Sequence, residues 1–198
     1  MKVIGAIIAG GKSSRMAGQE KAFLKLGGKT ILSHVIGRFS PHVDQLVINA
    51  NGGGQRFMEF GLMVVPDILR NLTTPLSGLH AALSFANEVK GDVLVTVPSD
   101  TPFLPADLVA RLMEKMITGG AAIASSGDQD HYLIGAWKTG LLDDLERAVA
   151  KDGLFRVKDW ASRILAAKVK WPATPHDPFF NINAPEDLLR AEQIASGA

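Results

Sequence analysis

The chain has 198 residues, and its 21 Lys and Arg residues against 20 Asp and Glu residues give a formal net charge of +1 at pH 7. Such a balance excludes the strong overall field that draws proteins to nucleic acids or anionic membranes. The chain has no cysteine, which excludes disulfides and thiolate metal sites. No apolar run approaches the ~18 residues of a membrane span, and the first run is too short for a signal peptide. We therefore expect one soluble cytoplasmic domain, residues 1–198, that binds neither nucleic acid nor membrane.

Two periodicities alternate along the first half of the chain. Short apolar runs rich in β-branched residues predict parallel strands that are buried on both faces. These runs are residues 2–9, 46–49, 62–65 and 92–97. Apolar residues at helical spacing predict helices between and after these strands. The helical segments are residues 31–39, 76–85 and 108–116.

The second half of the chain is less regular. Two apolar segments, residues 121–126 and 131–137, flank the turn-rich sequence GDQD and predict an antiparallel pair added to the sheet. The whole alternation of strands and helices predicts an α/β fold with a mixed, mostly parallel central sheet flanked by helices. Further helices are predicted at residues 141–150 and 154–165, and a short strand at residues 168–171.

The closing sequence NAPEDLLRAEQIA predicts a last helix. Asn183 and Glu186 have the spacing of a capping box, in which each side chain accepts a hydrogen bond from the other residue's backbone. Pro185 is compatible with the first turn of that helix, where no backbone donor is needed. A structural role as a cap would therefore account for Asn183.

The stretch AGGKSSRM, residues 9–16, follows the first predicted strand and is similar to the end of a P-loop. A P-loop places four residues between its two glycines. Here five residues separate Gly5 from Gly11, and these residues are typical of a buried strand. The chain also shows no obvious catalytic base or arginine finger, so an ATPase is disfavoured.

Candidate binding residues lie in the loops that follow the predicted strands. Ligands of open α/β sheets bind beyond the carboxyl ends of the strands, so these loops should meet at one edge. Paired glycines allow a backbone to approach an anion closely, and nearby cations neutralise its charge. An aspartate that ends a buried strand is typical of Mg²⁺ sites completed by phosphate and water. The residues concerned are Gly10, Gly11, Lys12, Arg15, Lys21, Asn49, Asn51, Asp67 and Asp100.

Plainer structural interpretations stay open for each of these features taken singly. A glycine pair by itself is more typical of a tight turn than of a binding loop. Asp100 by itself is as typical of a turn cap as of a metal ligand. The five histidines show no metal-ligand spacing, and we keep His131 as a candidate.

Six stretches of the sequence together resemble one known family. The first, IIAGGKSSRMAGQEKAFLKLGGKTIL, is similar to the signature L-A-G-G-x-S-x-R-M-G-x-D-K. The others are VINAN, VVPD, PLSG, PSDTPFLP and NINAPEDL, so the resemblance covers nearly the whole chain. The combination resembles the molybdenum cofactor guanylyltransferase (MobA) family of nucleotidyltransferases. The chain departs from the family pattern at Ala17, Glu20, Thr74 and Tyr132.

The resemblance implies a three-layer Rossmann-like nucleotidyltransferase fold. It implies a nucleotide-binding half at about residues 1–102 and an acceptor-binding half at about residues 103–198. It further implies transfer of GMP from GTP to the terminal phosphate of the molybdenum cofactor, with release of pyrophosphate and with Mg²⁺ as cofactor.

The resemblance also implies roles for particular residues. Lys21, Arg15 and Asp100 would be catalytic, and Asp100 would hold Mg²⁺. Asn181 and Asn183 would lie on the pterin side of the site, where His131 is added as a further candidate. The implied GTP-binding set is Ile8, Ala9, Gly10, Gly11, Arg15, Lys21, Asn49, Asp67 and Asp100.

Several alternatives remain open from the sequence. The first signature is shared with cytidylyl, uridylyl and sugar-phosphate enzymes, although the double glycine favours the guanylyl branch over the Ala-Gly of cytidylyl enzymes. A cytidylyltransferase acting on the same cofactor, a sugar-phosphate nucleotidyltransferase and a noncatalytic nucleotide or cofactor carrier therefore stay in consideration. Expected partners are GTP, the molybdenum cofactor and a molybdoenzyme or cofactor-delivery protein, with the chain as a monomer or weak homo-oligomer.

Overall fold

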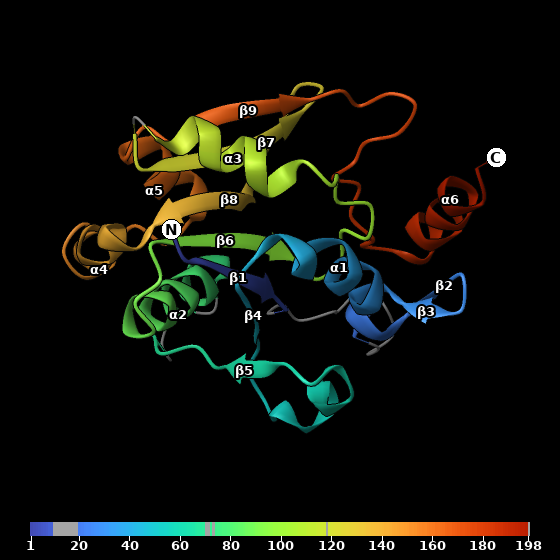
Figure 1. The fold of residues 1–198 in the computed structure, drawn as a ribbon, viewed down its shortest axis with the longest axis horizontal. Coiled ribbons are helices and arrows are strands. Elements are labelled where there is room, and N and C mark those ends of the chain that lie inside the picture. Colours follow the sequence, from blue (N-terminus) through green and yellow to red (C-terminus); the bar gives the residue numbers. More distant parts are fainter. Residues whose placement is uncertain (10–19, 70–71, 73, 118, 198) are drawn as a thin grey trace.

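The computed structural model describes residues 1–9, 20–69, 72, 74–117 and 119–197 (Figure 1). Seven strands form one sheet in the order β5-β4-β1-β6-β8-β7-β9. A separate ribbon pairs β2 (Lys25–Leu26) with β3 (Lys29–Thr30). The strands of the large sheet are β1 (Val3–Ile8), β4 (Gln45–Asn49), β5 (Met63–Val65), β6 (Val93–Pro98), β7 (Ala121–Ser126), β8 (Gln129–Lys138) and β9 (Ala167–Trp171).

The sheet is mixed and mostly parallel, as predicted. Strand β1 pairs in parallel with both β4 and β6, and β4 pairs in parallel with β5. Strand β8 is antiparallel to its two neighbours, β6 and β7, while β9 is parallel to β7. All six residues of β1 are buried, because this strand lies inside the sheet and is covered on both faces.

Helices cover both faces of the sheet, which confirms the predicted α/β architecture. One core cluster joins α1 and α3 to one face, and a second joins α2, α4 and α5 to the other. Helix α6 packs beside the β2–β3 ribbon through a third, smaller cluster (Figure 1). The α-helices are α1 (Ile31–Phe39), α2 (Pro75–Glu88), α3 (Leu108–Met116), α4 (Leu142–Ala150), α5 (Val157–Arg163) and α6 (Pro185–Ser196). The 3₁₀ helices are η1 (Lys21–Phe23), η2 (Ser40–His42), η3 (Gly54–Phe60) and η4 (Thr139–Leu141).

One predicted helix is shorter than its apolar pattern indicates. The pattern over residues 154–165 predicts a helix of that length, but α5 covers only Val157–Arg163. Gly153 and Leu165 both have positive φ angles, of 63° and 53°, so the backbone leaves helical geometry on either side.

None of the helices in the described part of the chain has the length and hydropathy of a membrane span.

A bulge interrupts the pairing of β7 with β8. Ile123 pairs with Gly135, whereas the next residue, Ala124, pairs with His131. The three residues of β8 between those partners, 132–134, are therefore displaced from the regular ladder. Bulges of this kind redirect side chains and are common beside active sites.

Helix α2 approaches β1 and β4 closely because Gly78 has no side chain. A Cβ atom at this position would overlap Oδ1 of Asn49 and would lie 3.0 Å from Cγ2 of Ile8. Asn49 cannot easily move away, because it is buried and its amide nitrogen donates to the backbone oxygen of Val65. The glycine of the PLSG motif is thus required for packing.

We expect Gly78→Ala to lower the free energy of unfolding by about 1–3 kcal/mol, the usual range for overpacking a core. The matched control is Gly37→Ala in α1, where a Cβ would meet no heavy atom within 4 Å. Gly37→Ala should raise the free energy of unfolding by about 0.5–1 kcal/mol, because alanine loses less entropy in a helix. Urea denaturation of both variants measures the difference, and equal effects would contradict this account.

Candidate functional site

A carboxylate and an ammonium group meet at the carboxyl end of the parallel strands. Asp100 lies in the turn after β6, and Lys21 begins η1. Lys21 Nζ is 3.7 Å from Asp100 Oδ2, and the two side chains are only 22% and 18% exposed. The structure therefore brings together two of the three residues that the resemblance implies to be catalytic.

The third catalytic candidate, Arg15, lies outside the described residues. The same holds for Gly10 and Gly11, so the roles predicted for the glycine-rich loop stay predictions. Ala9 is described, and its backbone nitrogen donates to the backbone oxygen of Asn49 at 2.8 Å. This bond holds the start of the loop beside the end of β4.

Asp100 is electrostatically unusual. Burial raises the pKa of its carboxyl group above the ordinary value, and the nearby Lys21 ammonium only partly opposes this effect. A buried carboxylate whose charge is incompletely balanced is a favourable place for a cation, and such groups concentrate at functional sites.

Whether the site suits a magnesium ion depends on which side chains near Asp100 could bind it. No cluster of three or more histidine, aspartate and glutamate side chains suited to a metal occurs among the residues that the structure describes. Asp100 is thus unsuited to hold a resident metal by itself. It does fit Mg²⁺ that arrives with a triphosphate, because Mg²⁺ takes one or two carboxylates and fills its other positions with phosphate and water.

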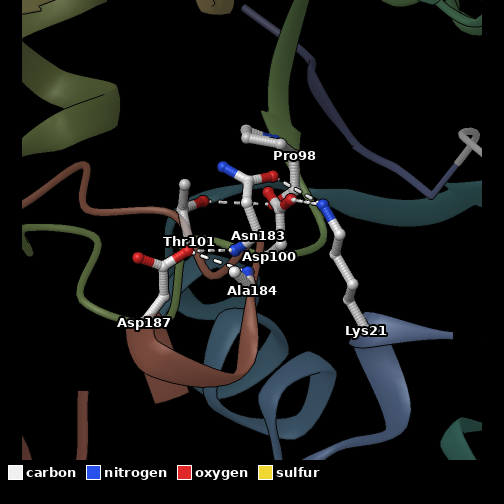
Figure 2. A network of polar contacts seen from close by, with 7 residues as sticks. All are labelled: Lys21, Pro98, Asp100, Thr101, Asn183, Ala184 and Asp187. Atoms are coloured by element: carbon white, nitrogen blue, oxygen red, sulfur yellow. Dashed lines mark hydrogen bonds and ion pairs between the residues drawn. The ribbon is translucent and has the colours of Figure 1, made fainter. Parts of the chain in front are cut away.

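The segment before α6 contacts both residues of the pair, and Figure 2 shows its contact with Lys21. The backbone nitrogen of Ile182 donates to the backbone oxygen of Asp100 at 3.0 Å. Lys21 Nζ donates to Oδ1 of Asn183 at 2.5 Å. The side chain of Asn183 is therefore in the site and does not cap the helix.

The predicted capping box is wrong in its residues. Ala184 is the N-cap of α6, and the acceptor at the third helical position is Asp187, not Glu186. Asp187 Oδ2 accepts hydrogen bonds from the backbone nitrogens of Asn183 at 2.8 Å and Ala184 at 2.9 Å. The shift arises because Pro185 takes the first helical position, which makes the residue before it the cap.

A second polar network joins the ends of β4 and β5 to the start of α2. Asn49 Nδ2 donates to Asp67 Oδ1 at 2.9 Å, and Asn51 Nδ2 donates to Asp67 Oδ2 at 2.8 Å. Ser77 Oγ lies within hydrogen-bonding distance, 3.0 Å, of the same Asp67 oxygen. The structure thus brings together Asn49 and Asp67, as expected. Ser77 was missed, although it belongs to the PLSG motif.

A cavity of about 320 Å³ opens beside Asp100. The ends of β1 and β6 line one side through Ile8 and Asp100, and the bulged start of β8 lines another through His131. Phe179 and Asn181 complete it from the segment that leads to α6. Two predicted acceptor residues, His131 and Asn181, therefore share a cavity with the predicted metal ligand. Phe179 was missed because its apolar side chain carries no functional signal in sequence.

His131 is held in one orientation within this cavity. Its Nε2 atom is 2.6 Å from Ser126 Oγ, and its ring centroid is 4.9 Å from that of Phe179. Burial lowers the pKa of His131, while Asp177 and Asp130 partly oppose this effect. The imidazole is therefore expected to be neutral at physiological pH, with one nitrogen able to donate and the other able to accept.

An ion pair lies at the rim of the cavity. Asp130 Oδ2 is 2.7 Å from Lys168 Nζ and accepts a hydrogen bond from the Tyr132 hydroxyl at 3.0 Å. The hydrogen bond from Lys168 lowers the pKa of Asp130, so this carboxylate stays charged. Tyr132, which departs from the family pattern, is thus accommodated by a partner two residues away.

Comparisons with known proteins show the family to which the chain belongs. The model of the MobA-like NTP transferase domain matches residues 5–167. The chain belongs to the MobA-like NTP transferase family. A relative, the molybdenum cofactor guanylyltransferase of Nitrobacter hamburgensis (strain DSM 10229 / NCIMB 13809 / X14), is 41% identical over 196 residues, which span 97% of this chain and 94% of that protein.

Solved structures place this MobA-like NTP transferase among nucleotidyltransferases. The molybdopterin-guanine dinucleotide biosynthesis protein A of Archaeoglobus fulgidus superposes with a TM-score of 0.74 at 26% identity, covering 98% of this chain and 100% of that one. The 4-diphosphocytidyl-2C-methyl-D-erythritol synthase of Anaerococcus prevotii DSM 20548 gives a TM-score of 0.75 at 12% identity, covering 98% of both chains. The second match shows a shared fold, which confirms the predicted nucleotidyltransferase architecture.

The raised pKa of Asp100 predicts how stability depends on pH. The folded state binds the Asp100 proton more tightly than the unfolded state, so wild-type stability falls as pH rises from the ordinary carboxyl value through the raised one. Asp100→Asn cannot ionise and should therefore gain stability relative to wild type across this interval. Urea unfolding at acidic and neutral pH measures the gain, with the exposed Glu59→Gln as control. A variant that is less stable at neutral than at acidic pH, relative to wild type, would contradict the assignment.

Proposed function

We propose that this MobA-like NTP transferase transfers GMP from GTP to the terminal phosphate of the molybdenum cofactor. The observation that carries the proposal is the position of Lys21 and Asp100 between two candidate binding regions at one edge of the sheet. The Asn49–Asp67 network lies on the nucleotide side, and the His131 cavity lies on the acceptor side. The full-length similarity to a molybdenum cofactor guanylyltransferase supports the same reaction.

The reaction needs positioned charge more than covalent chemistry. An oxygen of the acceptor phosphate forms a bond to the α-phosphorus of GTP, and the bond from that phosphorus to the bridging oxygen breaks. Pyrophosphate leaves with the electron pair. The acceptor phosphate is already ionised at neutral pH, so no general base is required.

Lys21 is the described residue best placed to stabilise the developing charge. Its side chain is only 22% exposed and its ammonium group contacts Asp100 and Asn183, so it is directed into the site. Arg15 is proposed to assist at the phosphates. Asp100 would hold Mg²⁺, which when bound would neutralise charge on the phosphates.

Asp67 is proposed to contact the guanine nucleoside. A carboxylate has about four acceptor positions, and the contacts from Asn49, Asn51 and Ser77 hold this one in place without using all of them. Guanine presents adjacent N–H donors on its pairing edge, whereas cytosine presents an acceptor beside its amino group. The remaining acceptor position of Asp67 is proposed to receive an N–H group of guanine, and the label-transfer experiment distinguishes GTP from CTP.

The cavity beside Asp100 is proposed to bind the pterin end of the acceptor. Its volume of about 320 Å³ is within the range typical of small-molecule sites. Phe179 and the neutral His131 offer aromatic surface to a planar heterocycle, and Asn181 offers an amide. Asn183 is proposed to act at the boundary between acceptor and phosphates.

A cytoplasmic location, recipient or delivery proteins and a monomeric or weakly oligomeric state remain predictions from the sequence.

One experiment tests the proposed reaction. Each α-labelled nucleoside triphosphate is offered with Mg²⁺ and the molybdenum cofactor, and transfer of label into product is measured. We expect label from GTP and release of pyrophosphate. Label only from CTP would support a cytidylyltransferase, label on a sugar phosphate would support a sugar-phosphate enzyme, and GTP binding without pyrophosphate release would support a carrier.

Loss of either member of the charged pair should abolish most turnover. We expect Lys21→Ala and Asp100→Asn each to lower kcat by about 100-fold or more, as when a charge-stabilising group is removed from other enzymes. The control is Lys25→Ala, an exposed lysine in β2 that should leave kcat unchanged. Far-ultraviolet circular dichroism checks that the variants are folded. Near wild-type rates for Lys21→Ala would overturn its role.

A further inference from the structure

The turn before α6 connects the acceptor cavity to the charged pair. Phe179 and Asn181 line the cavity, Ile182 donates to the backbone of Asp100, and Asn183 accepts from Lys21. Lys21 and Asn183 are 162 residues apart in the chain, and the turn lies beyond residue 167, where the family match ends. Residues 179–183 therefore link the cavity to both Asp100 and Lys21.

One carboxylate holds this turn in shape. Asp187 Oδ2 accepts from two successive backbone nitrogens, those of Asn183 and Ala184, so it fixes the backbone that carries the Asn183 side chain. Lysine has a flexible four-carbon stem, and its ammonium group takes a defined position only where partners hold it. In this structure the side-chain hydrogen bond of Lys21 goes to Asn183 (Figure 2).

We propose that Asp187 is a positioning residue for the transfer reaction, acting through Asn183 on the ammonium group of Lys21. The inference rests on the proposed function for its effect on rate, but the contact itself is independent of the reaction. The transfer rate is sensitive to the position of the charged groups, because a misplacement of about 1 Å can lower a rate about 100-fold. Holding Lys21 in place before the substrates bind would therefore favour turnover.

The neighbouring Glu186 separates positioning from a general effect on the helix. Both carboxylates lie in the first turn of α6, where negative charge stabilises the positive end of the helix dipole. Glu186 is exposed, and the two backbone nitrogens of the turn donate to Asp187 instead. Replacing either residue by alanine removes one charge from the helix end, but only the Asp187 variant releases the turn.

The experiment compares the variants in the label-transfer assay. We expect Asp187→Ala and Asn183→Ala each to lower kcat roughly tenfold or more, and Glu186→Ala to leave kcat within about twofold of wild type. In an Asn183→Ala background, Asp187→Ala should cause little further loss, because both act on Lys21 through one path. Asp187→Glu should recover part of the rate, because glutamate at this helical position also accepts from the cap backbone.

Losses that multiply in the double variant, or an equal loss for Glu186→Ala, would overturn the proposal. A second measurement decides the question even if wild type transfers no nucleotide, and even if Asp187→Ala is too unstable to assay for activity. The side-chain amine resonance of Lys21, identified by its absence in Lys21→Arg, reports the order of the ammonium group by NMR relaxation. We expect a clear loss of order in Asp187→Leu, which removes both acceptor oxygens, and in Asn183→Ala, and none in Glu186→Ala; unchanged order in either Asp187→Leu or Asn183→Ala would refute positioning.

Discussion

The register of β1 with its two parallel neighbours is the constraint on which the site depends. Ile8, the last residue of β1, is paired with Asn49 on β4 and with Pro98 on β6. Asn49 is in turn paired with Val65 on β5. Four strands thus end in one row, and the loops that leave them begin at the same edge. Asp67 and Asp100 each lie two residues beyond this row. The pairing of the buried strands therefore brings these two carboxylates to the same edge of the sheet.

The same row explains why packing and function are inseparable around Asn49. Its amide holds Asp67, its backbone oxygen receives Ala9, and its side-chain oxygen leaves no space for a side chain at Gly78. A change in any of these contacts would move the candidate nucleoside site together with helix α2. The buried amide nitrogen of Asn49 donates to Val65 and Asp67, as buried polar groups generally require.

Asp100, by contrast, is a buried charged group that its neighbours compensate only partly. Its burial opposes ionisation, and Lys21 offsets this only in part. A fold under selection for stability alone would place an uncharged residue at the end of β6. A buried carboxylate whose charge is only partly balanced is typical of functional positions.

The sequence by itself determined the alternation of strands and helices, the mixed sheet and the loops that carry Lys21, Asn49, Asp67 and Asp100. These follow from local periodicity and from the rule that parallel strands share a carboxyl edge. Periodicity could not predict the bulge in β8, because register depends on two strands at once. It also misplaced the ends of α5, where two positive φ angles interrupt an apolar pattern.

Only the tertiary structure decided which residues meet. The spacing of Asn183 and Glu186 indicated a cap, but Pro185 shifts the cap by one residue and leaves the Asn183 side chain to contact Lys21. Phe179 and Ser126 gained their roles beside His131 in the same way. The physical reason is that these contacts join different elements of the fold. The local sequence pattern does not determine how far apart those elements lie in the folded protein.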